Sequence, residues 1–341
     1  PAALPPPPAP PAPPSQPASA FETNEYYGSS TGALNPNSGL AYIGASTAYS
    51  RGGTGAGITV AVIDTNIDPA VDELDGQLSA KSIDVIVDLN GGTRSADNID
   101  PSGHGATVST VLAGRKNGTG MHGVAFDATI LHIRADTPGS CQNDGADEDG
   151  CTYSDSNLVK AINYAVANDA KVINMSLGGE IDNDPTLENA IRAAAAAGVL
   201  VVVSAGNDGA PPTGSDPAEG LFPNEPAHIA GQPASLGMVV AVGSIDFRNG
   251  AIAKSSNRAG NPPGNSNLRN SYILAPGVRV IAQGPDDNVA LPGDAGNDLD
   301  DDADYYLVSG TSFAAPYVSG SLALMLDAFP NRAPAQALQI L

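Results

Sequence analysis

The stretch "SGTSFAAPYVSGSLALML", residues 309–326, decides the fold of this chain. It contains no charged residue, and the hydroxyl of Ser312 is followed by small residues, a proline and an apolar run. Taken alone, it fits a buried core helix, a membrane span, or a helix whose N-terminal serine carries chemistry. Its Ser, Thr, Gly, Pro and Tyr content falls short of the roughly 20 mostly apolar residues that a span needs. The rest of the chain must decide between the other two.

Length and charge exclude several classes of function. The chain has 341 residues, of which 41% are hydrophobic, so it can bury a substantial core in one large domain or two small ones. It carries 15 Lys and Arg against 37 Asp and Glu, a formal net charge of -22. Such a charge repels nucleic acid and anionic membranes, so neither is predicted as a partner. An acidic composition with few lysines is compatible with an exported protein.

The two ends of the chain differ from its centre. Residues 1–17, "PAALPPPPAPPAPPSQP", predict an extended polyproline spacer, and we place a flexible linker at 1–20 and the globular domain at 21–341. No basic segment followed by an apolar segment precedes the spacer, so we expect any export signal to be absent or removed. The final residues, "RAPAQALQIL", look like the start of a helix, and we expect the natural protein to continue.

Short apolar runs alternate with helical patterns along the domain. The runs are β-branched and continuous, which is typical of strands buried on both faces. They are residues 57–65, 128–135, 171–177, 199–206 and 238–245. Helical patterns lie between them at residues 104–112, 156–168 and 186–198. This alternation predicts an α/β fold, a doubly wound, mainly parallel sheet flanked by helices, with the functional site beyond the carboxyl ends of the strands.

Three separated residues combine into a candidate catalytic set. Asp64 ends the first apolar run, His104 stands between glycines at a helix start, and Ser312 opens the charge-free stretch. Each has an ordinary structural interpretation, as a turn cap, a turn residue and a helix N-cap respectively. Their order along one α/β sheet, Asp then His then Ser, also matches one known arrangement of a catalytic triad.

Five motifs in the same order carry a family resemblance. They are "AVIDTNID", "GHGATVSTVLAG", "VINMSLGG", "VVVSAGNDG" and "SGTSFAAPYVSGSLALML". From about residue 39 to its end, the chain resembles the subtilisin-like serine peptidases. The resemblance implies that Ser312 is the nucleophile, His104 its general base and Asp64 the group that orients the imidazole. It also implies that the Asn207 amide and the Ser312 N–H stabilise the oxyanion.

The same resemblance implies where a substrate binds. In the family, the segment that corresponds to "SLGG" from Ser176, which follows a buried strand, pairs with an extended peptide as an added strand. Five small or apolar residues are expected to form the specificity pocket: Ser176, Leu177, Gly178, Ala205 and Gly206. We expect the pocket to accept a sizeable apolar side chain, while its floor cannot be located from the sequence.

The chain departs from the family pattern at two positions near these motifs. Asn66 stands where the family usually has glycine, and Tyr317 replaces a histidine. Asparagine tolerates a left-handed backbone better than other non-glycine residues, so the turn can survive. Pro316 is expected in the first helical turn, where a missing N–H has no effect. The remaining histidines, His122, His132 and His228, match no catalytic position and are interpreted as structural.

The cysteines and acidic runs allow more than one interpretation. In an exported chain Cys141 and Cys151 are expected to form a disulfide, whereas in the cytosol they stay free. Zinc needs more ligands than these two thiols. The acidic residues between them either form a solvated loop or favour substrates with basic residues before the scissile bond. An acidic run from Asp294 could bind structural calcium, but it does not fit the twelve-residue calcium loop, so we assign no metal ligand and no cofactor.

The function predicted from these observations is that of a secreted or surface-exposed serine endopeptidase. It would cleave protein or peptide substrates through an acyl-enzyme and act as a monomer. The Pro-rich start and the single cysteine pair resemble the passenger domain of a bacterial autotransporter. Two alternatives remain: a catalytically silent member of the same fold that serves as an adhesin or binding module, and an intracellular peptidase.

Overall fold

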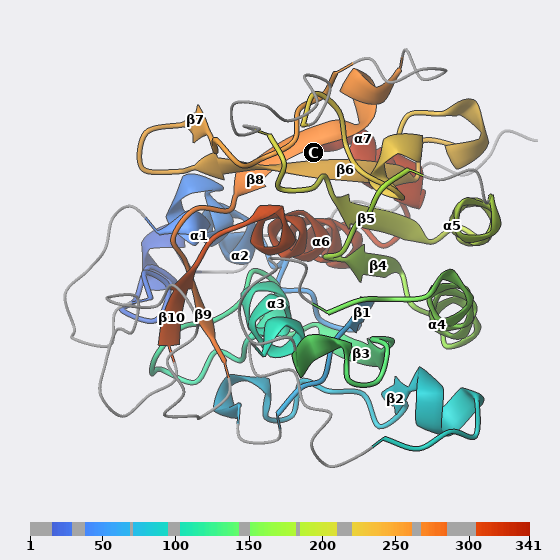
Figure 1. The fold of residues 1–341 in the computed structure, drawn as a ribbon. Coiled ribbons are helices and arrows are strands. Elements are labelled where there is room, and N and C mark those ends of the chain that lie inside the picture. The colour runs from blue at the N-terminus through green and yellow to red at the C-terminus, as the bar shows by residue number, and fades with distance from the viewer. Residues whose placement is uncertain are drawn as a thin grey trace, which may run out of the picture.

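The computed structural model describes residues 16–28, 38–68, 71–94, 103–142, 151–181, 185–209, 220–260, 267–284 and 305–341. One twisted sheet forms the centre of the described chain, with strand order β2-β3-β1-β4-β5-β6-β7 and β8 paired to β6 (Figure 1). The strands are β1 (Thr59–Asp64), β2 (Ile83–Asp84), β3 (Thr129–Arg134), β4 (Val172–Met175), β5 (Leu200–Ser204), β6 (Val239–Asp246), β7 (Ala251–Ile252) and β8 (Tyr272–Pro276).

The predicted parallel sheet is confirmed. Strands β2, β3, β1, β4, β5, β6 and β8 pair in parallel with their neighbours, and β7 alone runs antiparallel within the described sheet. Every residue of β4 and β5 is buried, as expected for continuous β-branched runs. A separate antiparallel pair, β9 (Val280–Gln283) with β10 (Tyr305–Val308), was not predicted. Each strand is only four residues long, too short to stand out as a run.

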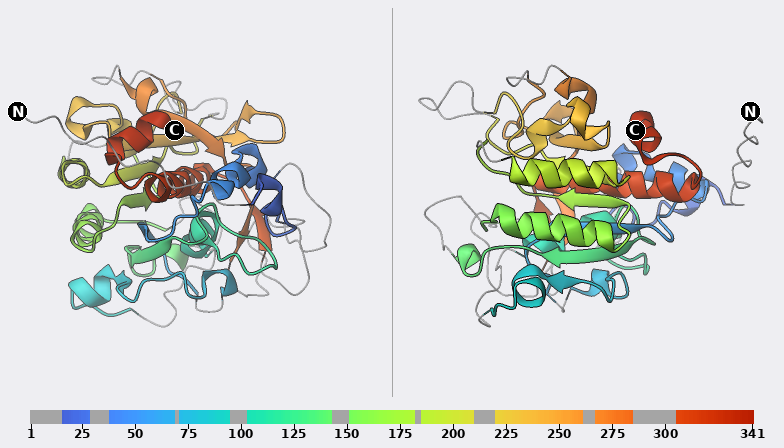
Figure 2. Two further views of the ribbon diagram at one scale, coloured as in Figure 1. Left: turned by 180° about the vertical axis from the view of Figure 1, so that it is seen from behind. Right: turned by 90° about the vertical axis from the view of Figure 1, so that its right-hand side faces the viewer.

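Helices cover both faces of the sheet (Figure 2). Helices α4 (Asp155–Ala167) and α5 (Thr186–Ala196) lie side by side on one face, and α3 (His104–Ala113) and α6 (Thr311–Ala328) pack together on the other. The shorter α-helices are α1 (Gly39–Tyr42), α2 (Ala45–Ser50) and α7 (Pro334–Ile340). Further single turns are Ala18–Ala20, Asp72–Leu74, Val85–Leu89, Ser140–Gln142, Ala227–Ile229, Pro233–Ser235 and Leu268–Ser271.

Helix α6 is the buried core helix that the charge-free stretch allowed. It packs across β4, β5, β6 and β8, and most of its side chains are buried. Within the described ranges, no helix combines the length and the apolar character required to cross a membrane. Gly320 lets the neighbouring segment come close, because a Cβ built there would lie 2.6 Å from the Val124 Cβ and 3.3 Å from the Leu112 carbonyl oxygen.

The predicted position of Pro316 in α6 was wrong. The helix begins at Thr311, so Pro316 lies five residues further on, in the second turn rather than the first. In an α-helix the N–H of residue 316 would bond to the carbonyl of Ser312, four residues earlier. Proline has no N–H, so the Ser312 carbonyl has no helical donor.

The substitution Gly320→Ala should destabilise the protein, although alanine normally favours a helix over glycine. The added methyl group would overlap Val124, and such overpacking costs about 1–3 kcal/mol of unfolding free energy. Urea denaturation followed by circular dichroism measures the change, with Ser321→Ala in the same helix as the control. Equal or greater stability of Gly320→Ala would contradict the close packing described here.

Candidate active site

Three elements bring the predicted catalytic residues to one edge of the sheet. Asp64 is the last residue of β1, His104 the first of α3, and Ser312 the second of α6. Helices α3 and α6 pack against each other, and their first turns carry His104 and Ser312, respectively. The His104 ring centroid lies 5.6 Å from that of Phe313, the residue after Ser312.

Asp64 and His104 form a direct contact. Asp64 is fully buried, and the distance from His104 Nδ1 to Asp64 Oδ1 is 2.7 Å. The same oxygen accepts the Thr65 backbone N–H at 2.8 Å and lies 3.5 Å from the Tyr153 hydroxyl. A carboxylate held in this way orients the ring and turns its Nε2 away from Asp64.

Ser312 stands where α6 leaves the preceding loop. Gly310, just before the helix, has a φ of 153°, a conformation that side chains rarely adopt. The Ser312 side chain is half-buried, and its hydroxyl donates to the Ser176 carbonyl at 3.3 Å.

Asn207 is oriented by a residue that the sequence did not single out. Its Oδ1 accepts both the Thr311 backbone N–H, at 2.9 Å, and the Thr311 hydroxyl, at 3.2 Å. The same hydroxyl accepts the Gly206 N–H at 3.2 Å. With the amide oxygen held by two donors, the Asn207 NH₂ group points the other way, and the residue is exposed. Thr311 was overlooked because threonine is common at helix starts as an ordinary capping residue.

The segments predicted to bind substrate lie next to each other. Ser176, Leu177 and Gly178 follow β4, and Ala205 and Gly206 follow β5. The Ser204 hydroxyl links the two segments by donating to the Leu177 carbonyl at 3.1 Å.

A third segment, which sequence reasoning missed, connects the edges formed by residues 176–179 and 205–206. The Asn224 N–H donates to the Ala205 carbonyl at 2.9 Å, and Glu225 exchanges two backbone hydrogen bonds with Gly179, at 3.0 and 3.1 Å. A Cβ built on Gly178 would lie 3.2 Å from the Glu225 carbonyl oxygen, so glycine suits this close approach. Residues 224 and 225 lie in a loop without apolar periodicity, which left no signal to find them.

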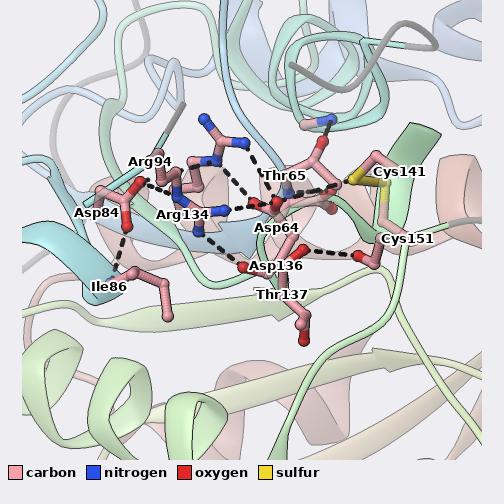
Figure 3. A network of polar contacts seen from close by, with 12 residues as sticks. Asp64, Thr65, Asp84, Ile86, Arg94, Arg134, Asp136, Thr137, Cys141 and Cys151 are labelled. Atoms are coloured by element: carbon pink, nitrogen blue, oxygen red, sulfur yellow. Dashed lines mark hydrogen bonds and ion pairs between the residues drawn. A yellow bond between two sulfur atoms is a disulfide. The ribbon is translucent and has the colours of Figure 1, made fainter. Parts of the chain in front are cut away.

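A buried ion-pair network supports the carboxyl end of β3 beside Asp64 (Figure 3). Asp136 is 1% exposed and pairs with Arg94 at 2.9 Å and with Arg134 at 2.7 Å. Arg94 also contacts Asp84. Because both carboxylate oxygens of Asp136 have cationic partners, the free-energy cost of burying this charge is offset.

The disulfide adjoins this network. Cys141 and Cys151 are joined, in agreement with the prediction for an exported chain, and Cys141 Sγ lies 3.8 Å from Asp136 Oδ2. Asp136 also forms a β-bridge with Tyr153, whose hydroxyl faces Asp64. The acidic residues between the cysteines, at 143–150, lie outside the described residues, and so does the acidic run at 294–304.

The described residues contain no group of three or more His, Cys, Asp or Glu side chains arranged to hold a metal. Two buried carboxylates share one donor residue. Asn117 donates its N–H to Glu25 at 2.6 Å and its side-chain amide to Glu73 at 3.2 Å. Burial raises the pKa of Glu73 to about 7, and the nearby Glu25 charge adds to this shift; burial also raises the pKa of Glu25. Glu25 Oε2 is buried without a hydrogen-bond partner among the described residues.

The other histidines of the described chain have surroundings of their own. His122 packs among Tyr49 and Phe126, His132 is buried in β3, and His228 pairs with Glu188 at 2.8 Å. Burial lowers the pKa of His122 and of His132 to about 4, so both rings are neutral near pH 7.

Comparison with known proteins establishes the family. The Subtilase family of peptidases matches residues 55–341. The chain belongs to this family and is a serine endopeptidase with a subtilisin-like fold.

Individual relatives support the same assignment. The chain is 29% identical to "Subtilisin DY" of Bacillus licheniformis over 298 residues, which cover 87% of each protein. It is 31% identical to the "Major intracellular serine protease" of Bacillus subtilis (strain 168), over 84% of this chain and 74% of that protein. Among solved structures, the prenylagaramide maturation protease PagA superposes with a TM-score of 0.60 at 26% identity, covering 86% of this chain and 84% of that one.

The Glu25–Glu73 pair should make stability depend on pH. The folded-state pKa of Glu73 is raised from 4.5 to about 7, so the stabilisation from its protonation is fully present below pH 4.5 and is lost as the pH rises to about 7. Ionisation should lower the unfolding free energy by up to about 3 kcal/mol.

Urea denaturation between pH 5 and 8, in the presence of a chelator, measures this dependence. Glu73→Gln should flatten it and stabilise the protein at pH 8. The exposed residue Asp75 provides the control Asp75→Asn, which should leave the dependence unchanged. A wild-type stability that rises steadily from pH 5 to 8 would contradict the prediction.

Proposed function

We propose that Asp64, His104 and Ser312 form the catalytic triad and hydrolyse peptide bonds through an acyl-enzyme. The observation that carries this proposal is the 2.7 Å contact between His104 Nδ1 and the fully buried Asp64, beside the helix start that bears Ser312. A buried carboxylate stabilises the imidazolium that forms when His104 takes a proton. The family membership supports the same roles.

The reaction begins with proton transfer from Ser312 to His104. The Ser312 hydroxyl, which donates to the Ser176 carbonyl, first rotates toward Nε2 of His104. As Nε2 takes the proton, Oγ bonds to the substrate carbonyl carbon. The C–N bond then breaks, His104 gives the proton to the leaving amine, and the acyl-enzyme remains. Water, deprotonated by His104, attacks the ester and releases Ser312 and the second product.

The tetrahedral intermediate requires donors for its oxyanion. The Asn207 NH₂ group is one, because its amide oxygen is occupied by Thr311. The Ser312 N–H is the other, since an N–H in the first turn of a helix has no acceptor within the helix. The positive end of the α6 dipole favours the same negative charge. Two fixed donors need no reorganisation during the reaction.

The substrate is an extended protein or peptide segment. Its backbone adds to the edge formed by residues 176–178, and one side chain enters between this edge and Ala205–Gly206. We assign residues 224 and 225 to the floor of this pocket, and their backbone contacts with Ala205 and Gly179 support this assignment. No metal is required for these steps, so the catalytic role is carried by the chain's own residues.

A calcium ion with a structural role is proposed at the Glu25–Glu73 pair. Hard oxygen ligands suit calcium, and Glu25 Oε2 is a buried oxygen without a partner among the described residues. The pH titration repeated with calcium in place of the chelator tests this. Calcium should abolish the loss of stability toward pH 8 in the wild type and have no effect in Glu73→Gln.

Export is proposed for the whole protein, from the acidic composition and the Cys141–Cys151 disulfide. We further infer a monomeric passenger domain of an autotransporter, from the Pro-rich start. The intracellular relative shows that the family also works inside cells, so a thiol count on protein from its native source decides between the two. Two free thiols would overturn export.

A fluorophosphonate probe tests whether Ser312 is an active nucleophile. The wild type should be labelled and Ser312→Ala should not, because only an activated serine attacks the probe. Ser321→Ala, later in the same helix, serves as the control and should be labelled normally. A well-folded wild type that resists labelling would instead support the silent binding module.

Asn207→Ala tests the oxyanion hole separately. Loss of this donor lowers turnover by about 10²–10³ in subtilisin itself, and we expect a loss of the same order here. Steady-state kinetics on a peptide substrate should show the loss in kcat with little change in KM, because the contact strengthens only in the transition state. A change confined to KM would assign Asn207 to substrate binding.

A further inference from the structure

A continuous path of buried hydrogen bonds runs from the middle of α6 to the nucleophile. The Ser319 hydroxyl donates to Asn174 Oδ1 at 2.7 Å, and Asn174 Nδ2 donates to Ser176 Oγ at 3.0 Å. Ser176 Oγ in turn donates to the Ser312 carbonyl at 2.7 Å. Ser319 and Asn174 are fully buried and Ser176 is 3% exposed, so water does not compete for these bonds.

The chemistry of the groups fixes the direction of this path. A hydroxyl has one proton, and an amide has a donor end and an acceptor end. Because Asn174 Oδ1 accepts from Ser319, its NH₂ end faces Ser176. Ser176 Oγ therefore acts as an acceptor toward Asn174 and has its single proton for the Ser312 carbonyl. Each bond orients the next one.

The end of the path meets a defect in α6. The Ser312 carbonyl would normally accept the N–H of residue 316, but residue 316 is proline and has none. The Ser176 hydroxyl lies 2.7 Å from this carbonyl and supplies the missing donor. A buried carbonyl without a donor would otherwise be strongly disfavoured.

We propose that Ser176, Asn174 and Ser319 are positioning residues for the nucleophile, which act by holding the carbonyl of Ser312. This role rests on the proposed function of Ser312. The carbonyl, the oxyanion-hole N–H and Oγ all belong to one residue, so rotation of its backbone would displace both reacting groups. Catalytic groups must be held within about 0.5 Å and 10–20° of the productive geometry. Ser176 thus acts through its side chain as well as through the backbone edge that faces substrate.

The first experiment measures the second-order rate of fluorophosphonate inactivation together with kcat and KM. Ser176→Ala should lower the inactivation rate and kcat by about 10- to 100-fold, with KM within about 3-fold, because it leaves two buried groups without partners. Ser319→Ala should give about a 3-fold loss, since it frees only the far end of the path. Ser176→Thr, which keeps the hydroxyl, should recover most of the rate.

Ser109→Ala is the matched control. Ser109 is also a fully buried serine, in α3, but its hydroxyl has no partner in the described part of the chain. Its substitution should leave the rates unchanged. Wild-type rates in Ser176→Ala, or an effect confined to KM, would overturn the positioning role while leaving the proposed function intact.

Substitution of Pro316 provides a rescue that a merely structural role of Ser176 does not predict. Pro316→Ala returns an N–H to residue 316. The double variant should therefore be inactivated at least about 5-fold faster than Ser176→Ala alone. Failure of this rescue would show that the Ser312 carbonyl is not the group on which Ser176 acts.

A thermodynamic cycle tests the same contact without reference to activity. Ser176→Ala should raise the unfolding equilibrium constant by about 10-fold or more when residue 316 is proline, and by less than about 3-fold when it is alanine. Equal effects in the two backgrounds would overturn the inference. If the wild type proved unreactive while this cycle showed the coupling, the proposed function would fail and the contact would stand.

Discussion

The site depends on a buried carboxylate in contact with a partly exposed imidazole. Asp64 is fully buried at the end of β1, and His104 has 26% of its side chain exposed at the start of α3. A charge at such a depth is costly unless hydrogen bonds compensate it. The Thr65 N–H and the His104 ring do so through one oxygen. The arrangement works only if β1, α3 and the neighbouring strand hold their relative positions.

That requirement explains the polar network beside the site. The Asp64 carbonyl accepts the Ala135 N–H at 3.0 Å, and the next residue along the chain is the buried Asp136. Two arginines and a nearby disulfide hold Asp136 in place. A buried ion pair does not by itself add much stability, but it specifies one geometry where apolar packing would allow several. Here the specified geometry is that of the strand end next to Asp64.

Helix α6 has two opposing properties. Its apolar surface makes it the central packing element, whereas its first turn carries Ser312, the proposed nucleophile, at the sheet edge. Pro316 interrupts the helical hydrogen bonds close to that serine, and groups outside the helix take over: Ser176 for the Ser312 carbonyl and Asn207 for the Thr311 N–H. Side chains from two neighbouring strand ends therefore complete the start of the helix. The proposed nucleophile is thereby coupled to the sheet on which substrate is proposed to bind.

The sequence by itself determined the parallel α/β sheet and the strands that end at the site, and it predicted Asp64, His104 and Ser312 as a catalytic set. Continuous β-branched runs and local motifs are properties of short segments, so they can be read without coordinates. Only the tertiary structure decided which hydroxyl donates to the Ser312 carbonyl, that Thr311 orients Asn207, that residues 224 and 225 join the two edges, and that Asn117 donates to both Glu25 and Glu73. These contacts link residues far apart in the chain, and their directions depend on packing, for which local sequence carries no signal.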